Sequence, residues 1–217
     1  MLEFWLRPYD GWTRRLRTAC LRSPEPHSVS PTILLEGPYG HSHPLWTYDT
    51  ILFIVGGSGI TAAAPYLLDH ATRKATRTKQ ITLLWTDRSE AFIRSVASDR
   101  LASSLALPGV QARFFTTGAA TAPEGSSEGS EKEGDDAGAE KEASAKATNA
   151  DVHVASGRPD VAAAVVEAAR EGSESGYRVA VLVCGPAGMA DSARAAAYEA
   201  RRRYGDTVDY IEEAFGW

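Results

Sequence analysis

An apolar run that ends in a glycine turn constrains the fold more than any other stretch of this sequence. Residues 51–55 read Ile-Leu-Phe-Ile-Val and lead directly into Gly-Gly-Ser-Gly-Ile-Thr at 56–61. Glycines adopt positive φ and let a ligand approach the backbone, while the N-terminus of a following helix stabilises an anion by roughly 0.3–2 kcal/mol. The apolar residues 62–68 predict that helix, in which Pro65 is tolerated only near the first turn. The pattern fits a phosphate-binding turn, and equally a tight strand-to-helix turn without a ligand, because the full G-x-G-x-x-G motif is absent.

From residue 51 onward, strand-like apolar runs alternate with alanine-rich and leucine-rich stretches at helical spacing. The strands are expected at 51–55, 80–86, 110–116, 152–155, 178–184 and 207–212. The helices are expected at 61–75, 89–106, 160–171 and 187–203. This alternation predicts an α/β fold, a doubly wound parallel sheet with helices on both faces and right-handed crossovers.

One crossover differs in composition from all the others. Residues 118–150 contain eight acidic residues, three lysines and no aromatic or branched aliphatic side chain. They cannot offset their ordering entropy by burial, so a disordered acidic insertion is expected. This segment accounts for the whole net charge of -5. The remainder of the chain is neutral, which argues against a nucleic-acid partner.

The two cysteines, Cys20 and Cys184, lie far apart, and neither has metal-ligand spacing around it. This usage suits a reducing compartment and indicates neither a disulfide scaffold nor a metal site. The apolar runs are far shorter than the roughly 20 residues that a membrane helix needs, and residues 1–4 are not typical of a signal peptide. By itself the chain is therefore expected to be soluble.

Chemically informative residues follow four of the expected strands. Ligands of open α/β sheets bind beyond the carboxyl ends of the strands. The candidates at that edge are the glycine turn, Trp-Thr-Asp-Arg at 85–88, Ser-Gly-Arg-Pro-Asp at 156–160 and Cys-Gly-Pro-Ala-Gly at 184–188. Two arginines, one thiol and two further glycine turns thus converge on one edge, which is more than folding alone requires.

These residues also form a series of motifs in a familiar order. The chain resembles the C-terminal NAD(P)H-binding half of fungal ferric reductases, relatives of NADPH oxidases within the ferredoxin-reductase superfamily. The matching pieces are Arg7-Pro8 with Gly11-Trp12-Thr13-Arg14, Glu36-Gly37-Pro38-Tyr39-Gly40, the glycine turn at 56–61, the motifs at 85–88 and 156–160, Val183-Cys184-Gly185-Pro186, and the terminus at 212–217. Seven pieces across nearly the whole chain make the resemblance specific.

The resemblance implies a binding site for NADPH, with NADH as the alternative cofactor. The pyrophosphate is expected on the turn formed by Gly56, Gly57, Ser58, Gly59, Ile60 and Thr61. Arg88 and Arg158, the latter preceded by Gly157, are expected to take the adenosine end and its 2′-phosphate, because a guanidinium pairs bidentately with phosphate. The competing interpretation makes both arginines ordinary surface or capping residues.

The resemblance places Cys184, Gly185 and Pro186 against the nicotinamide. We assign the thiol a positioning role near the path of the hydride, because hydride transfer needs no thiolate nucleophile. The competing interpretation is a small buried residue at a strand end. In this superfamily a C-terminal aromatic side chain stacks on the flavin and moves aside for the nicotinamide, and stacking contributes about 0.5–1.5 kcal/mol. Phe215 is favoured for this role, and Trp217 is counted with the cofactor-binding residues.

The sequence departs from the family where the flavin is bound. The His-Pro-Phe-Thr signature is missing, and the single His-Pro, at 43–44, is followed by Leu-Trp. Residues 1–45, with short strands expected at 2–7 and 32–36, are interpreted as the remnant of an FAD-binding β-barrel, and residues 46–217 as the NAD(P)H-binding domain. The chain is therefore expected to be a fragment that holds little of the FAD site. The haem-binding membrane helices of the family are expected only in a full-length parent protein.

The implied function is to pass hydride from NADPH to FAD, from which electrons cross a membrane through haems to ferric or cupric ions. The partners are then the FAD domain and the haem-bearing membrane domain of the parent protein. The implied location is the cytosolic face of a membrane, with the plasma membrane favoured. Two alternatives remain open: an NADPH oxidase that reduces oxygen, and a nucleotide-binding or interaction module that has lost catalysis with its flavin domain.

Overall fold

The computed structural model describes residues 4–6, 8, 10–25, 27–37, 42–118 and 152–213. Nearly all of the acidic insertion and the aromatic C-terminus fall outside these ranges, so the predictions made for them are neither confirmed nor contradicted. The chain divides into two compact units, Met1–His43 and Pro44–Trp217, which are described separately.

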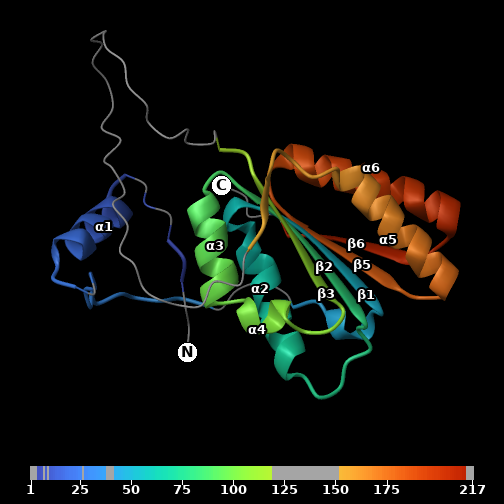
Figure 1. Ribbon diagram of the computed structural model, residues 1–217, viewed down its shortest axis with the longest axis horizontal. Helices are drawn as coiled ribbons and strands as arrows, with labels where there is room; N and C mark the ends of the chain where they lie inside the picture. Colours follow the sequence, from blue (N-terminus) through green and yellow to red (C-terminus); the bar gives the residue numbers. More distant parts are fainter. Residues whose placement is uncertain are drawn as a thin grey trace, which may run out of the picture. The chain divides into compact units, whose positions relative to one another are not determined.

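The second unit is built on a six-stranded sheet in which all neighbouring strands are parallel (Figure 1). Its strands are β1 (Thr50–Gly56), β2 (Gln80–Asp87), β3 (Val110–Thr116), β4 (Val154–Ser156), β5 (Val179–Cys184) and β6 (Val208–Glu212). Their spatial order is β4-β3-β2-β1-β5-β6, so the strands progress from β1 in one direction and then continue on its other side. The direction of winding therefore switches between β1 and β5.

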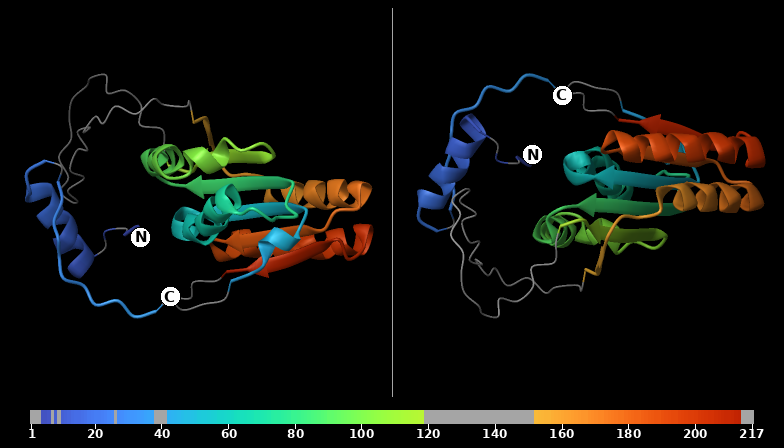
Figure 2. Two further views of the ribbon diagram at one scale, coloured as in Figure 1. Left: turned by 90° about the horizontal axis from the view of Figure 1, so that it is seen from below. Right: turned by 90° about the horizontal axis from the view of Figure 1, so that it is seen from above.

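Helices cover both faces of this sheet, as Figures 1 and 2 show. On one face lie α2 (Ile60–Thr72), α3 (Glu90–Asp99) and α4 (Ala102–Leu105), which pack against β1, β2 and β3. On the other lie α5 (Val161–Ser175) and α6 (Ala187–Tyr204), which pack against each other and against β1, β5 and β6. The doubly wound α/β architecture predicted from the sequence is confirmed.

The central strands are apolar throughout because both of their faces are covered. In β1, Leu52 and Ile54 belong to the core beneath α5 and α6, whereas Phe53 is buried on the opposite face and stacks on Tyr66 of α2 with the ring centres 6.1 Å apart. The alternation follows from the period of two along a strand. Helix α6 contributes a buried row of alanines to the first of these cores: Ala190, Ala193, Ala196, Ala197 and Ala200.

Two helices differ from the sequence-based expectation. The single helix expected at 89–106 is two helices, because the fully buried Leu101 donates its N–H to Val96 O, five residues back, and breaks the α-helical pattern. Helix α2 contains Pro65 well inside it, beyond the first turn to which sequence reasoning confined this residue. Proline has no N–H, so the carbonyl of Thr61 loses its usual partner within the helix.

In the first unit, the described residues contain a helix, α1 (Trp12–Arg22), and no strand. The predicted strands are wrong at 4–6 and 32–36, and the other positions of the first one lie largely outside the described residues. A strand needs a neighbour to satisfy its N–H and C=O groups, and among the described residues neither segment belongs to a strand of a sheet. The interpretation of residues 1–45 as the end of an FAD-binding barrel therefore gains no support from the described backbone.

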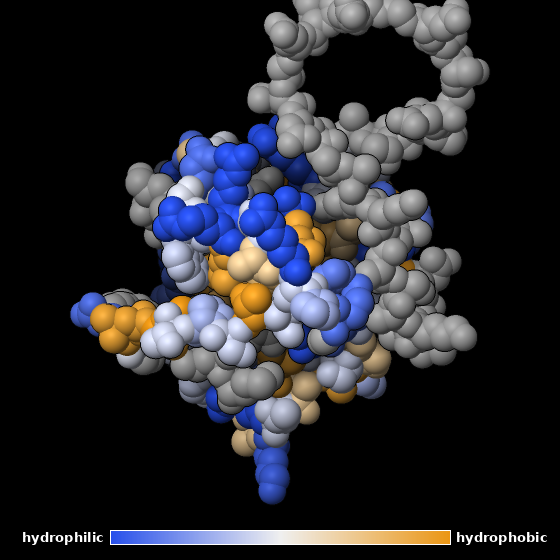
Figure 3. Space-filling model, turned by 90° about the vertical axis from the view of Figure 1, so that its left-hand side faces the viewer, coloured by the Kyte–Doolittle hydropathy of each residue, from blue (hydrophilic) through white to orange (hydrophobic). Residues whose placement is uncertain are grey.

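Apolar side chains remain exposed in this first unit. Figure 3 shows orange hydrophobic side chains among blue hydrophilic ones on the face that it draws. None of the α1 residues is buried, and Trp12 and Leu21 are exposed beside four arginines of the same helix. Leu34 is 98% exposed. The described part of this unit thus has little apolar core of its own.

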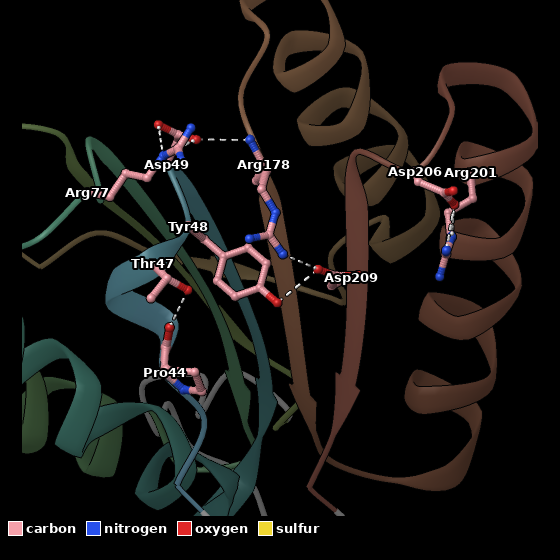
Figure 4. Close-up of polar contacts among 9 residues, drawn as sticks. All are labelled: Pro44, Thr47, Tyr48, Asp49, Arg77, Arg178, Arg201, Asp206 and Asp209. Atoms are coloured by element: carbon pink, nitrogen blue, oxygen red, sulfur yellow. Dashed lines mark hydrogen bonds and ion pairs between the residues drawn. The ribbon is translucent and has the colours of Figure 1, made fainter.

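A buried carboxylate ties together the amino ends of three strands in the second unit (Figure 4). Asp49, just before β1, accepts hydrogen bonds from Arg77 Nε at 2.9 and 3.0 Å and from the backbone N–H of Arg178 at 3.0 Å. Arg77 precedes β2 and Arg178 precedes β5. Beside this group, Tyr48 Oη and Arg178 Nη2 both donate to Asp209 Oδ2, at 2.8 and 3.0 Å.

Replacing Asp49 by asparagine (D49N) is expected to lower the free energy of unfolding by about 1.5–3 kcal/mol at pH 7, the usual range for hydrogen bonds to a charged group. The hydrogen bond from Arg77 lowers the pKa of Asp49 in the folded protein. The charge therefore stabilises the fold above the unfolded-state pKa of about 3.9, and this contribution is lost as the pH falls through the folded-state pKa. Urea unfolding should show the difference between wild type and D49N shrinking below about pH 4. A constant difference across that range would contradict this account.

Candidate functional site

The switch in winding direction brings two loops together at the carboxyl edge of the sheet. Val55, near the end of β1, is in register with Cys184, the last residue of β5. The connections that follow these strands lead to α2 on one face and to α6 on the other. Open parallel sheets bind their ligands at such a switch point, so the glycine turn and the Cys-Gly-Pro loop form the centre of the candidate site.

The glycine turn packs directly against the end of β5. Residues Gly57–Gly59 form one short 3-10 turn that leads into α2, and Gly57 has a φ of 57°, a conformation that favours glycine. A Cβ added to Gly59 would lie 3.0 Å from the carbonyl carbon of Cys184 and closer still to its oxygen. A Cβ added to Gly56 would lie 2.8 Å from Pro186 Cδ. Close packing of the two loops therefore requires glycine here, and the turn leads into the N-terminus of α2, an end that favours an anion.

A buried tryptophan holds this turn in place. Trp85 Nε1 donates a hydrogen bond to Gly57 O at 3.0 Å, although the residue itself lies on β2. Its ring is fully buried and meets Phe92 and Phe114 edge to face, at 5.5 and 6.1 Å between ring centres. Sequence reasoning placed Trp85 in a motif but missed this contact. The available signal was that a buried indole N–H needs an acceptor.

The turn after β2 is held by its own hydrogen bonds and presents Arg88 to solvent. Ser89 caps α3 by accepting the N–H of Phe92 at 3.2 Å, and its own N–H donates to Asp87 Oδ1 at 2.7 Å. A Cβ on Gly118, at the end of the β3 segment, would collide with the carbonyl oxygen of Arg88. The guanidinium of Arg88 is exposed, and no described residue forms an ion pair with it.

Arg158 is placed in a comparable way after β4. Gly157 has a φ of 110° and donates its N–H to Thr116 O at 2.8 Å, so the glycine is required by backbone conformation. Asp160 caps α5 by accepting the N–H of Ala163 at 2.9 Å. Arg158 is exposed and, within the described ranges, has no acidic partner. Because β2 and β4 flank β3, the backbones that carry the two arginines lie about two strand spacings, ~10 Å, apart.

Cys184 is buried between the two loops. Only 3% of the residue is exposed, and burial raises the pKa of its thiol to about 11, with a further contribution from the charge of Glu213. Glu213 follows β6 and donates its N–H to Val183 O at 2.9 Å, which brings it beside the thiol. The thiol is therefore neutral near pH 7. Sequence reasoning counted Glu213 in the terminal motif but not among the site residues.

Iodoacetamide at pH 8 is expected to alkylate Cys20 and to leave Cys184 almost unmodified in the folded chain. With a pKa of about 11, about one Cys184 thiol in a thousand is ionised at this pH, and only the thiolate reacts. Cys20 is partly exposed. Mass spectrometry of tryptic peptides measures both sites, and both should react after unfolding in guanidinium chloride. Equal labelling in the folded protein would contradict the assignment of Cys184 as a buried neutral thiol.

The predicted site residues fall into three groups. The glycine turn and the loop at 184–186 are in direct contact, whereas Arg88 and Arg158 lie at the same edge on either side of β3. Phe215 and Trp217 lie outside the described residues. In the described ranges, no three acidic, His or Cys side chains cluster to suit a metal ion, and no helix is long and apolar enough to cross a membrane.

Comparisons with known proteins agree with this geometry. Residues 48–198 match the family model described as the ferric reductase NAD binding domain. A "Probable cell surface ferric reductase kap2" of Aspergillus oryzae is 34% identical over 125 residues, covering 54% of this chain and 16% of that protein. "Ferric reductase transmembrane component 6" of Saccharomyces cerevisiae is 26% identical over 217 residues, covering 98% of this chain and 29% of that protein. "Dual oxidase 1" of Caenorhabditis elegans is 28% identical over 91 residues, covering 39% and 6%. The chain thus spans less than a third of the length of each of these relatives.

Proposed function

The chain belongs to the ferric reductase NAD binding domain family, and from this premise we propose that it binds NADPH at the carboxyl edge of its sheet and presents the nicotinamide to an FAD. The observation that carries the proposal is the contact between the glycine turn and Cys184 at the point where the winding direction switches. Only glycine fits at position 59 in this contact, because a Cβ there would collide with the carbonyl group of Cys184.

In this proposal the backbone of the glycine turn binds the pyrophosphate. The N–H groups from Gly57 to Thr61 precede or open α2, whose N-terminal dipole favours negative charge. Ile60 offers no side chain to the ligand because it is fully buried in the core, and its N–H donates within the turn to Gly57 O and Ser58 O. Arg88 and Arg158 bind the adenosine end and its 2′-phosphate, for which two exposed guanidinium groups without acidic partners among the described residues are well suited.

The loop at 184–186 positions the nicotinamide. Gly185 packs between Gly56 and Met189, since a Cβ there would lie 2.8 Å from Met189 Sδ and 3.2 Å from Gly56 N, and this packing fixes the loop against the end of β1. The thiol of Cys184 is buried against the glycine turn, where it helps to fix the loop, and in its neutral form it does not compete as a nucleophile. When bound, the dinucleotide supplies a hydride, and the role of this chain is to hold and orient the ring.

The relatives support a proposal for the function of the larger protein. Proteins named as ferric reductases and as a dual oxidase share this domain. We therefore propose that the chain is part of a larger protein in which FAD and haem carry electrons across a membrane to ferric or cupric ions. The chain would lie on the cytosolic face of that membrane, for which the plasma membrane is favoured. The match to a dual oxidase keeps oxygen as the alternative acceptor. Measuring both ferric-chelate reduction and oxygen uptake by a full-length protein that contains this chain would show which of the two acceptors it uses.

The direct test of the proposed function is calorimetric titration of this chain with NADPH and NADH. Saturable one-site binding of NADPH in the micromolar to low millimolar range is expected. No binding of either dinucleotide at millimolar concentration would overturn the proposal. Binding without any electron transfer, in a full-length protein that holds FAD, would instead favour the interpretation of the chain as a nucleotide-binding module without catalysis.

A further inference from the structure

The loop that joins α2 to β2 is strongly basic and lies at the amino edge of the sheet. Residues 73–79 read Arg-Lys-Ala-Thr-Arg-Thr-Lys, four cations without an acidic residue. They connect the C-terminus of α2 to Gln80, the first residue of β2. The seven residues of β1, about 20 Å of extended chain, separate this edge from the glycine turn. The proposed function therefore makes no use of the loop.

The two halves of this loop differ in their exposure. In the second half Thr78 is 8% exposed and donates its hydroxyl to Tyr48 O at 2.9 Å, so it is held in the fold. Residues 74–76 are exposed and belong to no helix or strand. Thr76 Oγ1 accepts the N–H of Thr78 at 3.1 Å and donates to no acceptor in the part of the chain that the structure describes. The hydroxyl of Thr76 is therefore accessible to another protein.

Two cations precede Thr76 at positions −3 and −2. Protein kinases select substrates partly by charge pattern, and a kinase with carboxylates beside its active site binds cations at these positions. Lys74 is exposed and has no acidic partner among the described residues. Arg73 lies 4.0 Å from the centre of the Trp46 ring and pairs with Asp69. Contacts of this kind at a surface are weak, so the carboxylates of a kinase can replace them.

Other hydroxyl residues also have an arginine three positions before them, but their backbones are regular. Thr18 Oγ1, for example, donates to Arg14 O at 3.0 Å within α1. A kinase groove takes an extended segment, which a helix or a paired strand supplies only by local unfolding. Within the described ranges, the hydroxyl residues that follow an arginine in this way and lie in a helix or strand are Thr18, Ser103, Thr116 and Ser173.

We propose that Thr76 is a phosphorylation site for a protein kinase that selects basic residues before the acceptor hydroxyl. The phosphate donor is ATP. Thr76 Oγ1 forms a bond to the γ-phosphorus, the bond from that phosphorus to the bridging oxygen of ADP breaks, and the hydroxyl proton passes to the catalytic base of the kinase. The proposal does not depend on dinucleotide binding.

The surroundings of Thr76 suit a phosphate group. Phosphothreonine adds a charge of about −1.5 to −2 and strong acceptor oxygens. Lys74 and Arg77 flank the site in sequence, and the Arg77 side chain is 55% exposed although its Nε binds Asp49 (Figure 4). Both cations can pair with the phosphate at the surface. The modification would lower the charge of the loop from +4 to about +2.

The test is phosphorylation of the whole folded chain with ATP and the catalytic subunit of cyclic-AMP-dependent protein kinase, which selects cations at positions −3 and −2. Mass spectrometry of chymotryptic peptides locates the phosphate, because trypsin cuts too close to Thr76. Thr76 should carry most of the phosphate, and Thr76→Ala should lower incorporation at least tenfold. Thr72→Ala is the matched control, since it removes an exposed hydroxyl that donates to helix carbonyls four residues earlier, and it should leave incorporation unchanged.

Two further variants separate the role of the hydroxyl from the shape of the loop. Thr76→Ser keeps a hydroxyl and an acceptor for the N–H of Thr78, so it should restore phosphorylation. The double change of Arg73 and Lys74 to alanine leaves Thr76 in place and should also lower incorporation at least tenfold, a result that holds even if Thr76→Ala fails to fold. Absence of phosphate on Thr76, equal incorporation in wild type and Thr76→Ala, or preferential labelling of the helical sites would overturn the proposal.

Discussion

Replacing Gly59 by alanine (G59A) is expected to lower the free energy of unfolding by about 3 kcal/mol or more and to abolish dinucleotide binding. The new Cβ would lie 3.0 Å from the carbonyl carbon of Cys184 and 3.1 Å from its sulfur. The carbonyl belongs to the backbone of the central strand β5, and overpacking against such a rigid neighbour costs at least about 1–3 kcal/mol. The chain can relieve the contact only by moving the glycine turn away from β5, which removes the cradle for the pyrophosphate.

Gly188 provides the matched control for this substitution. It lies in the first turn of α6, and a Cβ added there meets no atom within 4 Å. Alanine at this position should raise the stability by about 0.4–1 kcal/mol, because glycine loses more conformational entropy on folding. Urea unfolding and NADPH titration of both variants make the comparison. Wild-type stability and affinity in G59A would show that the turn is not packed against Cys184 as described.

The sheet could be predicted from the sequence because each of its central strands is an apolar run. The stretches around Phe53, Leu83 and Val181 are buried on both faces, and their sequences show it without any knowledge of their partners. All six expected strands are present, with boundaries shifted by two residues or fewer. The glycine turn could be predicted for the same reason, because it comes directly after the first of these apolar runs.

The first unit could not be predicted in the same way. The apolar residues at 32–36 favour a strand by propensity, yet Leu34 is almost fully exposed and the described part of this unit contains no strand beside it. Strand formation depends on a partner, which a local pattern does not supply. Residues Trp12–Arg22 form a helix, which the sequence analysis did not predict.

The candidate site was predicted in its motifs but not in its contacts. The sequence shows that Trp85, Asp87 and Arg88 follow one another, and the family pattern draws attention to the arginine. It does not show that the indole N–H of Trp85 reaches Gly57 O or that Asp87 faces the glycine turn. Both contacts join residues about 30 positions apart in the sequence, and they arise only when β1 and β2 pair in register. Tertiary register therefore decides which members of a motif meet the ligand.

Replacing both Arg88 and Arg158 by alanine is expected to weaken NADPH binding by a factor of about 100 while NADH binding falls only a few-fold. A charge-assisted hydrogen bond contributes about 1.5–3 kcal/mol, and 1.4 kcal/mol corresponds to a factor of ten in affinity. Both side chains are exposed, so the lower end of this range applies and each single variant should lose about tenfold. The fold should be unaffected, because neither guanidinium pairs with a described residue.

The control for these variants is Arg113→Ala, which removes an exposed arginine from the middle of β3 and leaves the carboxyl edge intact. NADPH and NADH titrations at low and high salt measure the effect, and the loss in the double variant should be larger at low salt because charges are then screened less. Equal losses of both dinucleotides in the double variant would place the 2′-phosphate elsewhere and leave the two arginines as ordinary surface residues.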